Sequence, residues 1–439
     1  MAQTLIERRD FLKRTAVAGA GLLILKSGTL SGQAASNKLN IAVIGVAGRG
    51  AGDIDGVKHE NIVALCDVDA NNLAAAAKRF PEAKTYSDWR LCLEQKDIDA
   101  VVCATTDHTH AFINTWAMNR GKHVYCEKPL ANGVHEARVV RETYLKNQGK
   151  LATQMGTQIH ATDNYRRVVE LIRDGVIGKV DDVRIWCSRE PKGGTYLPAA
   201  GQPPAHLNWD LWLGPSPEHP YNPEYFGGCL AWNLYWDFGS GQIGDMGSHM
   251  LDLPYWALNL RFPTSCEAQG TPLSTDTCPQ WLEAKWEHPA TAERGPVTVY
   301  WYDGGKKPGM PTKVFNRDEL FKGVLFKGDQ GWLLADYDFR IVMLRGDMTH
   351  YQRPETKDII PPSVGHHQEW LNACRDPKLP TLCNFDYSGA LIEHNLLAMV
   401  AYRTGKRLEW DAANLKATNC PEADAFVKKT YRQGWTLNG

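Results

Sequence analysis

The sequence predicts an α/β domain with a doubly wound parallel sheet, followed by an α+β domain with a large, mostly antiparallel open sheet. Two observations predict this order. Residues 39 to 149 alternate short apolar runs with amphipathic helical stretches, which is typical of parallel strands joined by crossover helices. After about residue 151, strand-like segments follow one another with few helices between them, which favours antiparallel pairing.

Length and composition are those of a globular protein. A chain of 439 residues with 43% hydrophobic and 23% charged residues is long enough for two domains with separate cores. The net charge of −1 gives no reason to expect a nucleic acid or an anionic membrane as partner. The eleven cysteines show no C-x-x-C spacing, so we expect buried thiols and no metal site.

The first 35 residues predict an export signal. Arg8 and Arg9 precede a weakly apolar stretch, residues 15 to 25, and small residues follow at Ala34 and Ala35. The alternative, a membrane anchor, is disfavoured because the apolar stretch is short and Lys26 ends it. We therefore expect a twin-arginine signal over 1–35, a periplasmic or otherwise exported protein, and no membrane span after processing. This route carries folded proteins, so a cofactor can be loaded before export.

The first folded domain is predicted to span residues 36–150. Its expected strands are 40–44, 62–66, 100–104 and 123–126, and its expected helices include 72–80 and 110–120. Each strand is a short apolar run, and each helix shows apolar residues at helical spacing.

The second domain is predicted to span residues 151–439, with a C-terminal segment that packs back on the first domain. Its expected helices are 165–174, 366–374 and 387–403, and its expected strands are 180–188, 280–286, 297–302, 323–326, 331–335 and 340–344. The Pro-, Gly- and Trp-rich segment 190–241 is too long for an ordinary connection, which makes it a candidate binding loop.

A glycine-rich turn follows the first strand and predicts a dinucleotide site. Gly45, Gly48 and Gly50 match the G-x-G-x-x-G fingerprint except that Ala47 stands at its second glycine, which adds one methyl group. Asp67 ends the next strand, 22 positions after Gly45. A carboxylate at that place binds the ribose hydroxyls and repels a 2′-phosphate, so NAD is favoured over NADP. The first domain is therefore predicted to be a Rossmann domain.

Two further stretches lie at predicted strand ends, where ligands of doubly wound sheets collect. They are Thr105-Thr-Asp-His-Thr-His110 and Glu127-Lys128-Pro129. Together with the turn, Asp67, Met155-Gly-Thr-Gln158, Gly175-Val-Ile-Gly-Lys179 and Gly244-Asp-Met-Gly-Ser-His249, they resemble the Gfo/Idh/MocA oxidoreductases, and the resemblance runs from about residue 39 to the C-terminus. Trp209-Asp-Leu-Trp-Leu-Gly-Pro215 and Gly365-His-His-Gln-Glu-Trp370 are similar to the secreted members of that family.

The resemblance implies a site for sugar oxidation. Lys128 is expected to touch substrate and nicotinamide, and Asp245 and His249 to lie beside the reacting carbon. The chemistry suits these groups: histidine accepts a proton near neutral pH, and a lysine ammonium stabilises a developing alkoxide. A spacing of four places Asp245 and His249 on one face of a helix.

The candidate cofactor-binding residues are Gly45, Ala47, Gly48, Arg49, Gly50, Asp67, Thr105, Asp107, His108, His110, Glu127 and Lys128. The candidate substrate-binding residues are Gln158, Tyr165, Arg166, Tyr235, Asp237 and His366. No metal ligand is predicted.

The leading hypothesis is an NAD-dependent oxidoreductase that acts on a secondary alcohol of a sugar, cyclitol or glycoside and holds its cofactor tightly. A second hypothesis is a redox-neutral glycoside hydrolase that oxidises C3 transiently, eliminates the aglycone, adds water and reduces the sugar again. Residues 250–256, Met-Leu-Asp-Leu-Pro-Tyr-Trp, resemble dehydrogenase members of the family more than glycosidase members. A third is a non-catalytic sugar-binding protein, which the retained Lys128, Asp245 and His249 disfavour. By resemblance, we expect a homodimer or homotetramer.

Overall fold

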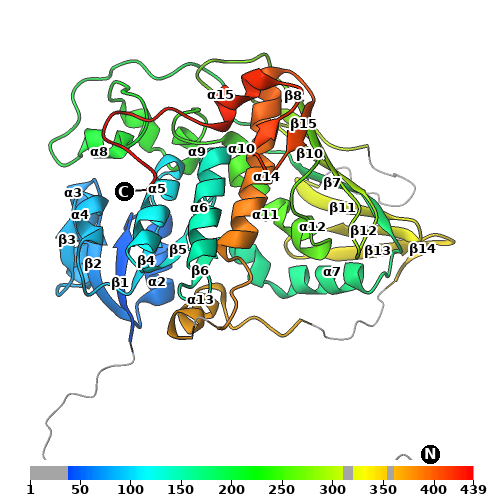
Figure 1. Cartoon of the computed structure of the whole chain (residues 1–439), viewed down its shortest axis with the longest axis horizontal. Helices are drawn as coiled ribbons and strands as arrows, with labels where there is room; N and C mark the ends of the chain where they lie inside the picture. Colours follow the sequence, from blue (N-terminus) through cyan, green and yellow to red (C-terminus); the bar gives the residue numbers. More distant parts are fainter. Residues whose placement is uncertain (1–37, 310–319, 353–359, 377, 439) are drawn as a thin grey trace, which may run out of the picture. The chain divides into compact units, whose positions relative to one another are not determined.

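The computed structural model describes residues 38–309, 320–352, 360–376 and 378–438; the predicted export signal lies outside them. The predicted order of an α/β domain and an α+β domain is confirmed. Figure 1 shows the two sheets, with the helices of the first domain packed around its parallel strands. Among the described residues, no helix combines the length and the apolar character needed to cross a bilayer.

The first sheet has six parallel strands in the order β3-β2-β1-β4-β5-β6. The strands are β1 (Asn40–Ile44), β2 (Asn61–Cys66), β3 (Lys84–Tyr86), β4 (Ala100–Cys103), β5 (His123–Cys126) and β6 (Thr153–Met155). The helices between them are α2 (Arg49–Val57), α3 (Ala70–Arg79), α4 (Trp89–Leu93), α5 (Asp107–Asn119) and α6 (Val134–Lys146). The strand order reverses between β1 and β4, and the carboxyl ends of those strands are where such sheets bind ligands.

The second sheet has ten strands among the described residues, in the order β14-β13-β12-β11-β7-β10-β9-β8-β15-β16. They are β7 (Val180–Cys187), β8 (Ser265–Gly270), β9 (Leu282–His288), β10 (Val297–Asp303), β11 (Lys322–Gly328), β12 (Gly331–Ala335), β13 (Arg340–Leu344), β14 (Asp347–Gln352), β15 (Leu408–Asp411) and β16 (Lys416–Ala417). β7 and β10 pair in parallel, and the other pairs are antiparallel. Along β10 buried and half-buried residues alternate, as expected for a sheet covered more fully on one face.

Helices of the second region are α7 (Asp163–Arg173), α8 (Trp209–Leu213), α9 (Cys229–Trp232), α10 (Gly241–Asp245), α11 (Gly247–Met250), α12 (Asp252–Ala257), α13 (His366–Arg375), α14 (Phe385–Thr404) and α15 (Asp424–Val427), with 3₁₀ turns at Gln158–Ala161, Pro223–Phe226 and Pro421–Ala423. The segment 190–241, expected as a long loop, contains the short helices α8 and α9. Each helix is only about one turn long, which is too short for apolar residues to recur at helical spacing in the sequence.

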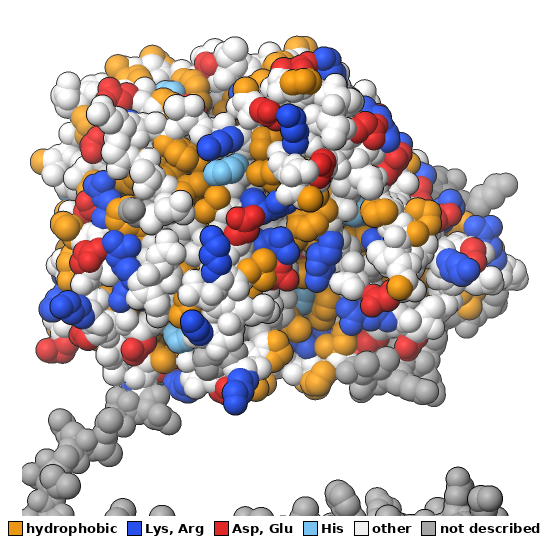
Figure 2. Space-filling model, viewed as in Figure 1, with side chains coloured by type: hydrophobic (Ala, Val, Ile, Leu, Met, Phe, Trp, Pro, Cys, Tyr) orange, Lys and Arg blue, Asp and Glu red, His pale blue; other side chains and the backbone are white. Residues whose placement is uncertain are grey.

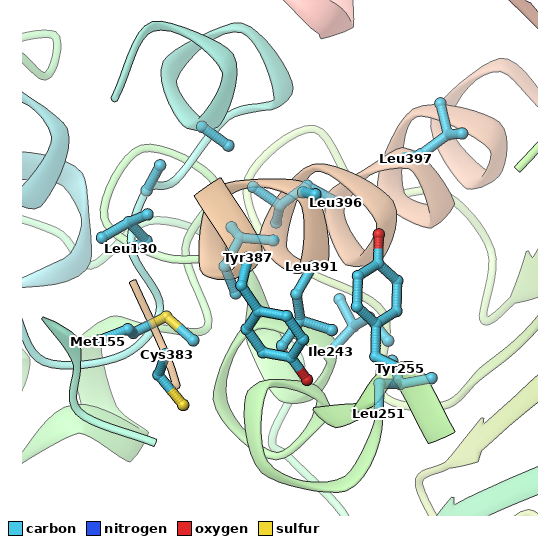
Figure 3. Close-up of a cluster of buried hydrophobic side chains, with 14 of the residues drawn as sticks. Leu130, Met155, Ile243, Leu251, Tyr255, Cys383, Tyr387, Leu391, Leu396 and Leu397 are labelled. Carbon is cyan, nitrogen blue, oxygen red and sulfur yellow. The ribbon is translucent and has the colours of Figure 1, made fainter. Parts of the chain in front are cut away.

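Helix α14 joins the two domains. It packs against α6 of the first domain and β8 of the second (Figure 1). Figure 3 shows its Tyr387, Leu391 and Leu396 packed among Leu130, from the first domain, and Tyr255. Arg138 of α6 also donates two hydrogen bonds to Glu393 of α14, at 2.9 and 2.8 Å. The two sheets are therefore held by one continuous apolar core.

The surface carries both signs of charge. On the face shown in Figure 2, basic and acidic side chains are interspersed, with apolar side chains between them. This distribution agrees with the net charge of −1 and gives this face no large single-sign field.

Candidate active site

The glycine turn is shaped by close packing of backbone. Gly45 has φ +83°, and a Cβ there would lie 2.5 Å from the Ala104 carbonyl oxygen. A Cβ on Gly50 would lie 1.9 Å from the Gly45 carbonyl oxygen. Only glycine fits either position, because real Cβ atoms do not approach oxygen so closely. The turn therefore holds its shape by sterics, and Ala47 and Gly48 are left to line the cavity above it.

Asp67 directly follows β2 and lines the same cavity. Its carboxylate accepts hydrogen bonds from the Val46 N–H at 3.0 Å and the Asp69 N–H at 2.9 Å. Burial raises the pKa of this carboxyl group, and the two backbone donors oppose that rise. The carboxylate is thus fixed beside the turn, where the sequence predicts a ribose-binding acid.

The start of α5 places its polar residues in two different environments. Thr105, Asp107 and His110 line the cavity, and burial raises the pKa of Asp107 well above its usual value. The His110 ring contacts two carbonyl oxygens, Pro129 O at 2.7 Å and Thr105 O at 3.0 Å. His108 does not line the cavity, because its ring packs between Trp212 and Phe238. His110 thereby ties together the two loops that carry the predicted motifs.

Glu127 connects the glycine turn to Lys128. Its carboxylate accepts a hydrogen bond from Arg49 Nε at 2.9 Å, and Arg49 also contacts Asp53 at 3.1 Å. Burial, with Asp53 as a like-charged neighbour, raises the pKa of Glu127 to about 7. A Cβ on Gly156 would lie 2.3 Å from Glu127, so this carboxyl group is enclosed by backbone.

Lys128, Asp245 and Arg189 form an ion triad, of which Lys128 and Asp245 line the other end of the cavity. Lys128 Nζ donates to one oxygen of the Asp245 carboxylate, and Arg189 Nη1 donates to the other at 2.6 Å. Burial opposes ionisation of both Lys128 and Asp245, but their mutual attraction outweighs it. The pKa of Lys128 is raised and that of Asp245 is lowered. Lys128 and Asp245 are therefore both charged near neutral pH.

His249 lies one helical turn after Asp245. Met246, between α10 and α11, keeps right-handed helical geometry, so the spacing of four does place both residues along one helical path. Burial, reinforced by the charge of Lys128, lowers the pKa of His249 to about 3. Within the described part of the chain its Nδ1 has no hydrogen-bond partner. His249 is thus neutral at neutral pH, whereas the sequence suggested titration near that pH.

Only some of the predicted substrate-binding residues lie at the cavity. Gln158 lines the cavity. Tyr165 is fully buried behind His249, and its hydroxyl donates to the His249 carbonyl oxygen at 3.1 Å. Arg166 points elsewhere and donates to the Pro361 carbonyl oxygen at 2.6 Å.

Tyr235, Asp237 and His366 do not reach the cavity. Tyr235 packs in an aromatic cluster, and Asp237 accepts hydrogen bonds from Tyr196 at 2.7 Å and His219 at 2.8 Å. The His366 ring contacts the Met155 carbonyl oxygen at 2.7 Å, and burial lowers its pKa to about 3. Their nearness in sequence to motif residues suggested a place at the site, but partners in the core hold all three.

Arg189 and most of the apolar wall of the cavity were not predicted from the sequence. Arg189 is a lone arginine just after β7, with no motif around it. The cavity, of about 470 Å³, is also lined by Asn72, Trp89, Leu211, Trp212, Phe226, Cys229, Trp232 and Asn233. Several of these come from segment 190–241, which its length and composition marked as a candidate binding loop without singling out these residues.

In the described part of the chain, no residue of the charged triad belongs to a group of candidate metal ligands. All eleven cysteines are free, and Cys229 alone is exposed. Among the described residues, two buried groups of three possible ligands occur: Cys103, His110 and Cys126, and His160, Asp252 and Cys383. Hydrogen bonds account for His110 and for His160, whose Nδ1 lies 2.9 Å from Asp252.

Comparison with known proteins identifies the family. Residues 39–155 match a family model described as an oxidoreductase family with an NAD-binding Rossmann fold, and residues 188–293 match the C-terminal alpha/beta domain of the same family. Together the two matches cover more than half of the chain. The chain belongs to the Gfo/Idh/MocA oxidoreductase family. Its first domain is the NAD-binding domain of that family, and its crowded glycine turn and fixed Asp67 carboxylate fit a dinucleotide.

Curated relatives match part of the chain. Inositol 2-dehydrogenase of Salmonella typhimurium is 33% identical over 148 residues, which are 32% of this chain and 43% of that protein. Levoglucosan dehydrogenase of Pseudarthrobacter phenanthrenivorans is 30% identical over 197 residues, 43% of this chain and 40% of that protein. The matches thus span less than half the length of these relatives.

Solved structures are similar over both domains. Levoglucosan dehydrogenase in complex with NADH and levoglucosan has a TM-score of 0.59 at 17% identity, over 85% of this chain and 99% of that one. The WlbA dehydrogenase of Bordetella pertussis, in complex with NADH and UDP-GlcNAcA, has a TM-score of 0.58 at 16% identity, over 85% and 99%. At these identities the likeness concerns the fold.

Proposed function

We propose that the protein is an NAD-dependent oxidoreductase that acts on a secondary alcohol of a sugar, cyclitol or glycoside. One observation carries the proposal: a single cavity is lined by the glycine turn and Asp67 at one end and by Lys128 and Asp245 at the other. The relatives named inositol 2-dehydrogenase and levoglucosan dehydrogenase support this class of substrate.

The charged residues suit the oxidation of a carbinol. The bound nucleotide would supply the hydride acceptor, held by the turn, Asp67 and the residues at the start of α5. Lys128 is kept charged by Asp245, so it can stabilise negative charge that develops on the carbinol oxygen. His249 lies one turn from Asp245 and is neutral, so a ring nitrogen lone pair is available as the proton acceptor. Its lowered pKa makes it a weak base, and it is not among the residues that line the cavity.

The same residues would serve the redox-neutral hydrolase, so a product assay must decide between the two. The protein is loaded with NAD and given myo-inositol, levoglucosan or a 4-nitrophenyl glycoside in separate reactions. The proposal predicts NADH formation with one of the polyols and no nitrophenol. Release of nitrophenol without net NADH would establish the hydrolase instead. The same protein with Lys128→Met is the control for contaminating activities.

We further propose that the protein is exported with its nucleotide bound and that each catalytic cycle restores that nucleotide through a second substrate or another acceptor. The paired Arg8 and Arg9 support export. Fractionation of cells that produce the wild type or the Arg8→Lys/Arg9→Lys variant tests this, with the wild type expected in the periplasm and the variant retained inside. Retention of both would contradict it.

Self-association is a separate proposal. Tyr300 and Tyr302 of β10 and Trp332 of β12 are half-buried, so the sheet presents aromatic surface that a second copy can cover. Light scattering on the purified protein is expected to give the mass of a dimer or tetramer. A monomer at micromolar concentration would contradict this proposal and leave the proposed activity untouched.

A further inference from the structure

A segment of the second domain is paired with the chain that follows Asp67. We call residues 204–215, which include α8, the strap. Leu207 forms an antiparallel bridge with Asp69. The Ala70 N–H donates to the His206 carbonyl oxygen at 2.8 Å, and the Asn208 N–H donates to the Val68 carbonyl oxygen at 2.9 Å. The strap thus continues the edge of the first domain directly beside the predicted ribose-binding carboxylate. Figure 1 shows α8 next to α3.

The strap also faces the cavity. Leu211 and Trp212 line it together with Gly45, Gly48 and Asp67. Trp212 is only 7% exposed, and its carbonyl oxygen lies 3.0 Å from His108 Nε2. A molecule held on the glycine turn and Asp67 is therefore in contact with a wall that the second domain supplies.

Arg432, in the C-terminal tail of the chain, forms hydrogen bonds with the other end of the strap. Arg432 donates to the Gly214 carbonyl oxygen at 3.1 Å, to the Asp210 carboxylate at 2.6 Å and to the Asp210 carbonyl oxygen at 2.9 Å. Its own N–H donates to the Pro215 carbonyl oxygen at 3.0 Å. The tail is anchored in turn on α5, where Trp116 donates to the Thr436 carbonyl oxygen at 3.1 Å.

We propose that the strap is part of the dinucleotide-binding site, with Leu211 and Trp212 in contact with the bound NAD, and that the nucleotide leaves only when the strap detaches. The inference rests on the proposed function, since it concerns the same cavity. Detachment breaks the backbone pairing with residues 68–70 and the Arg432 contacts, and it opens the aromatic cluster around Trp212. These events are coupled, because the strap is held at both ends, so we expect slow release.

The first test removes one backbone donor. Asn208 has φ −86°, which proline accepts, so Asn208→Pro deletes the N–H bonded to Val68 with little change of backbone shape. The change also removes the side chain that caps α8, so Asn208→Ala, which loses the cap and keeps the N–H, is the matched control. The protein is loaded with NADH and mixed with excess NAD⁺, and release is followed by loss of energy transfer from tryptophan to NADH. We expect Asn208→Pro to release NADH at least tenfold faster than Asn208→Ala.

The second test loosens the far end of the strap. Arg432→Met removes the contacts to Gly214 and Asp210, and Lys428→Met removes a positive charge from the same tail at an exposed position. Release is expected to be faster in Arg432→Met and unchanged in Lys428→Met, with thermal unfolding checking that both variants fold. If Asn208→Pro releases NADH at the same rate as Asn208→Ala, and Arg432→Met at the same rate as Lys428→Met, the strap is not part of the dinucleotide-binding site. Failure of the wild type to bind NADH at all would instead overturn the proposed function.

Discussion

The two ends of the cavity are formed by different kinds of chemical group. The glycine-turn end is backbone packed against backbone, with Gly45 and Gly50 enclosed by carbonyl groups. The other end is a charged triad, Lys128, Asp245 and Arg189, drawn from both domains. The first end is expected to fail when volume is added and the second when charge is removed. Nucleotide binding at the turn and catalysis at the triad therefore depend on separable properties of one cavity.

The largest expected effect is the removal of charge at the triad. Lys128→Met keeps much of the side-chain volume and deletes the ammonium that faces Asp245. Turnover is expected to fall about 10³-fold, because stabilisation of the developing alkoxide is lost. Initial rates with saturating NAD and polyol measure it. Lys150→Met, at an exposed position, is the control, and a Lys128→Met variant with wild-type turnover would remove the triad from the mechanism.

The next effect comes from added volume at the turn. Gly50→Ala places a Cβ 1.9 Å from the Gly45 carbonyl oxygen, so we expect a loss of about 3 kcal/mol in the free energy of unfolding and weaker NAD binding. Gly52→Ala lies in the same helix, where the nearest atom is Arg49 Nη1 at 3.9 Å, and is expected to stabilise by about 0.5–1 kcal/mol. Urea unfolding measures both. Equal stabilities would show that the turn tolerates side chains.

Glu127 lies between the two ends and gives a pH-dependent test. Its pKa is raised to about 7 from the ordinary 4.5, so ionisation costs the folded state more than the unfolded chain. The stability that protonated Glu127 contributes is complete below about pH 4.5 and is lost as the pH rises through about 7.

Glu127→Gln cannot ionise, so its free energy of unfolding should fall less over this pH range than that of the wild type, by about 3 kcal/mol. Urea unfolding at several pH values gives the two profiles, and Glu142→Gln, at an exposed position, should follow the wild type. Parallel profiles for wild type and Glu127→Gln would show that folding does not raise the pKa of this carboxyl group.

The smallest effect concerns nucleotide choice. Asp67→Asn keeps the shape of the side chain and removes its charge, so NAD should bind about tenfold more weakly and discrimination against NADP should decrease. Fluorescence titration with both nucleotides measures the ratio of the two affinities. An unchanged ratio would mean that Asp67 holds the turn through Val46 and Asp69 and takes no part in binding ribose.

Much of the first domain could be predicted because its strands are buried apolar runs. The strand at 123–126 was predicted with the bounds that β5 has, and 331–335 and 340–344 match β12 and β13. β3 (Lys84–Tyr86) was missed because it is three residues long and mostly exposed, so it carries no apolar pattern.

The candidate site was predictable where a motif fixes it and not where the tertiary fold does. Gly45 and Asp67 were predicted from their spacing relative to strand ends, and Lys128 from the resemblance to the family. Arg189 meets Asp245 across 56 residues of sequence, and the strap meets Asp69 across more than a hundred. His366 was expected at the site, but its neighbours in space are core groups, which spacing cannot reveal.

Whether this cavity holds NAD can be measured on the purified protein itself. The purified processed protein is denatured, any nucleotide released is identified by mass spectrometry, and the nucleotide-free protein is then titrated with NAD and NADP. We predict release of NAD or NADH, or a single site per chain that binds NAD more tightly than NADP. No released nucleotide together with no binding of either dinucleotide would contradict the account.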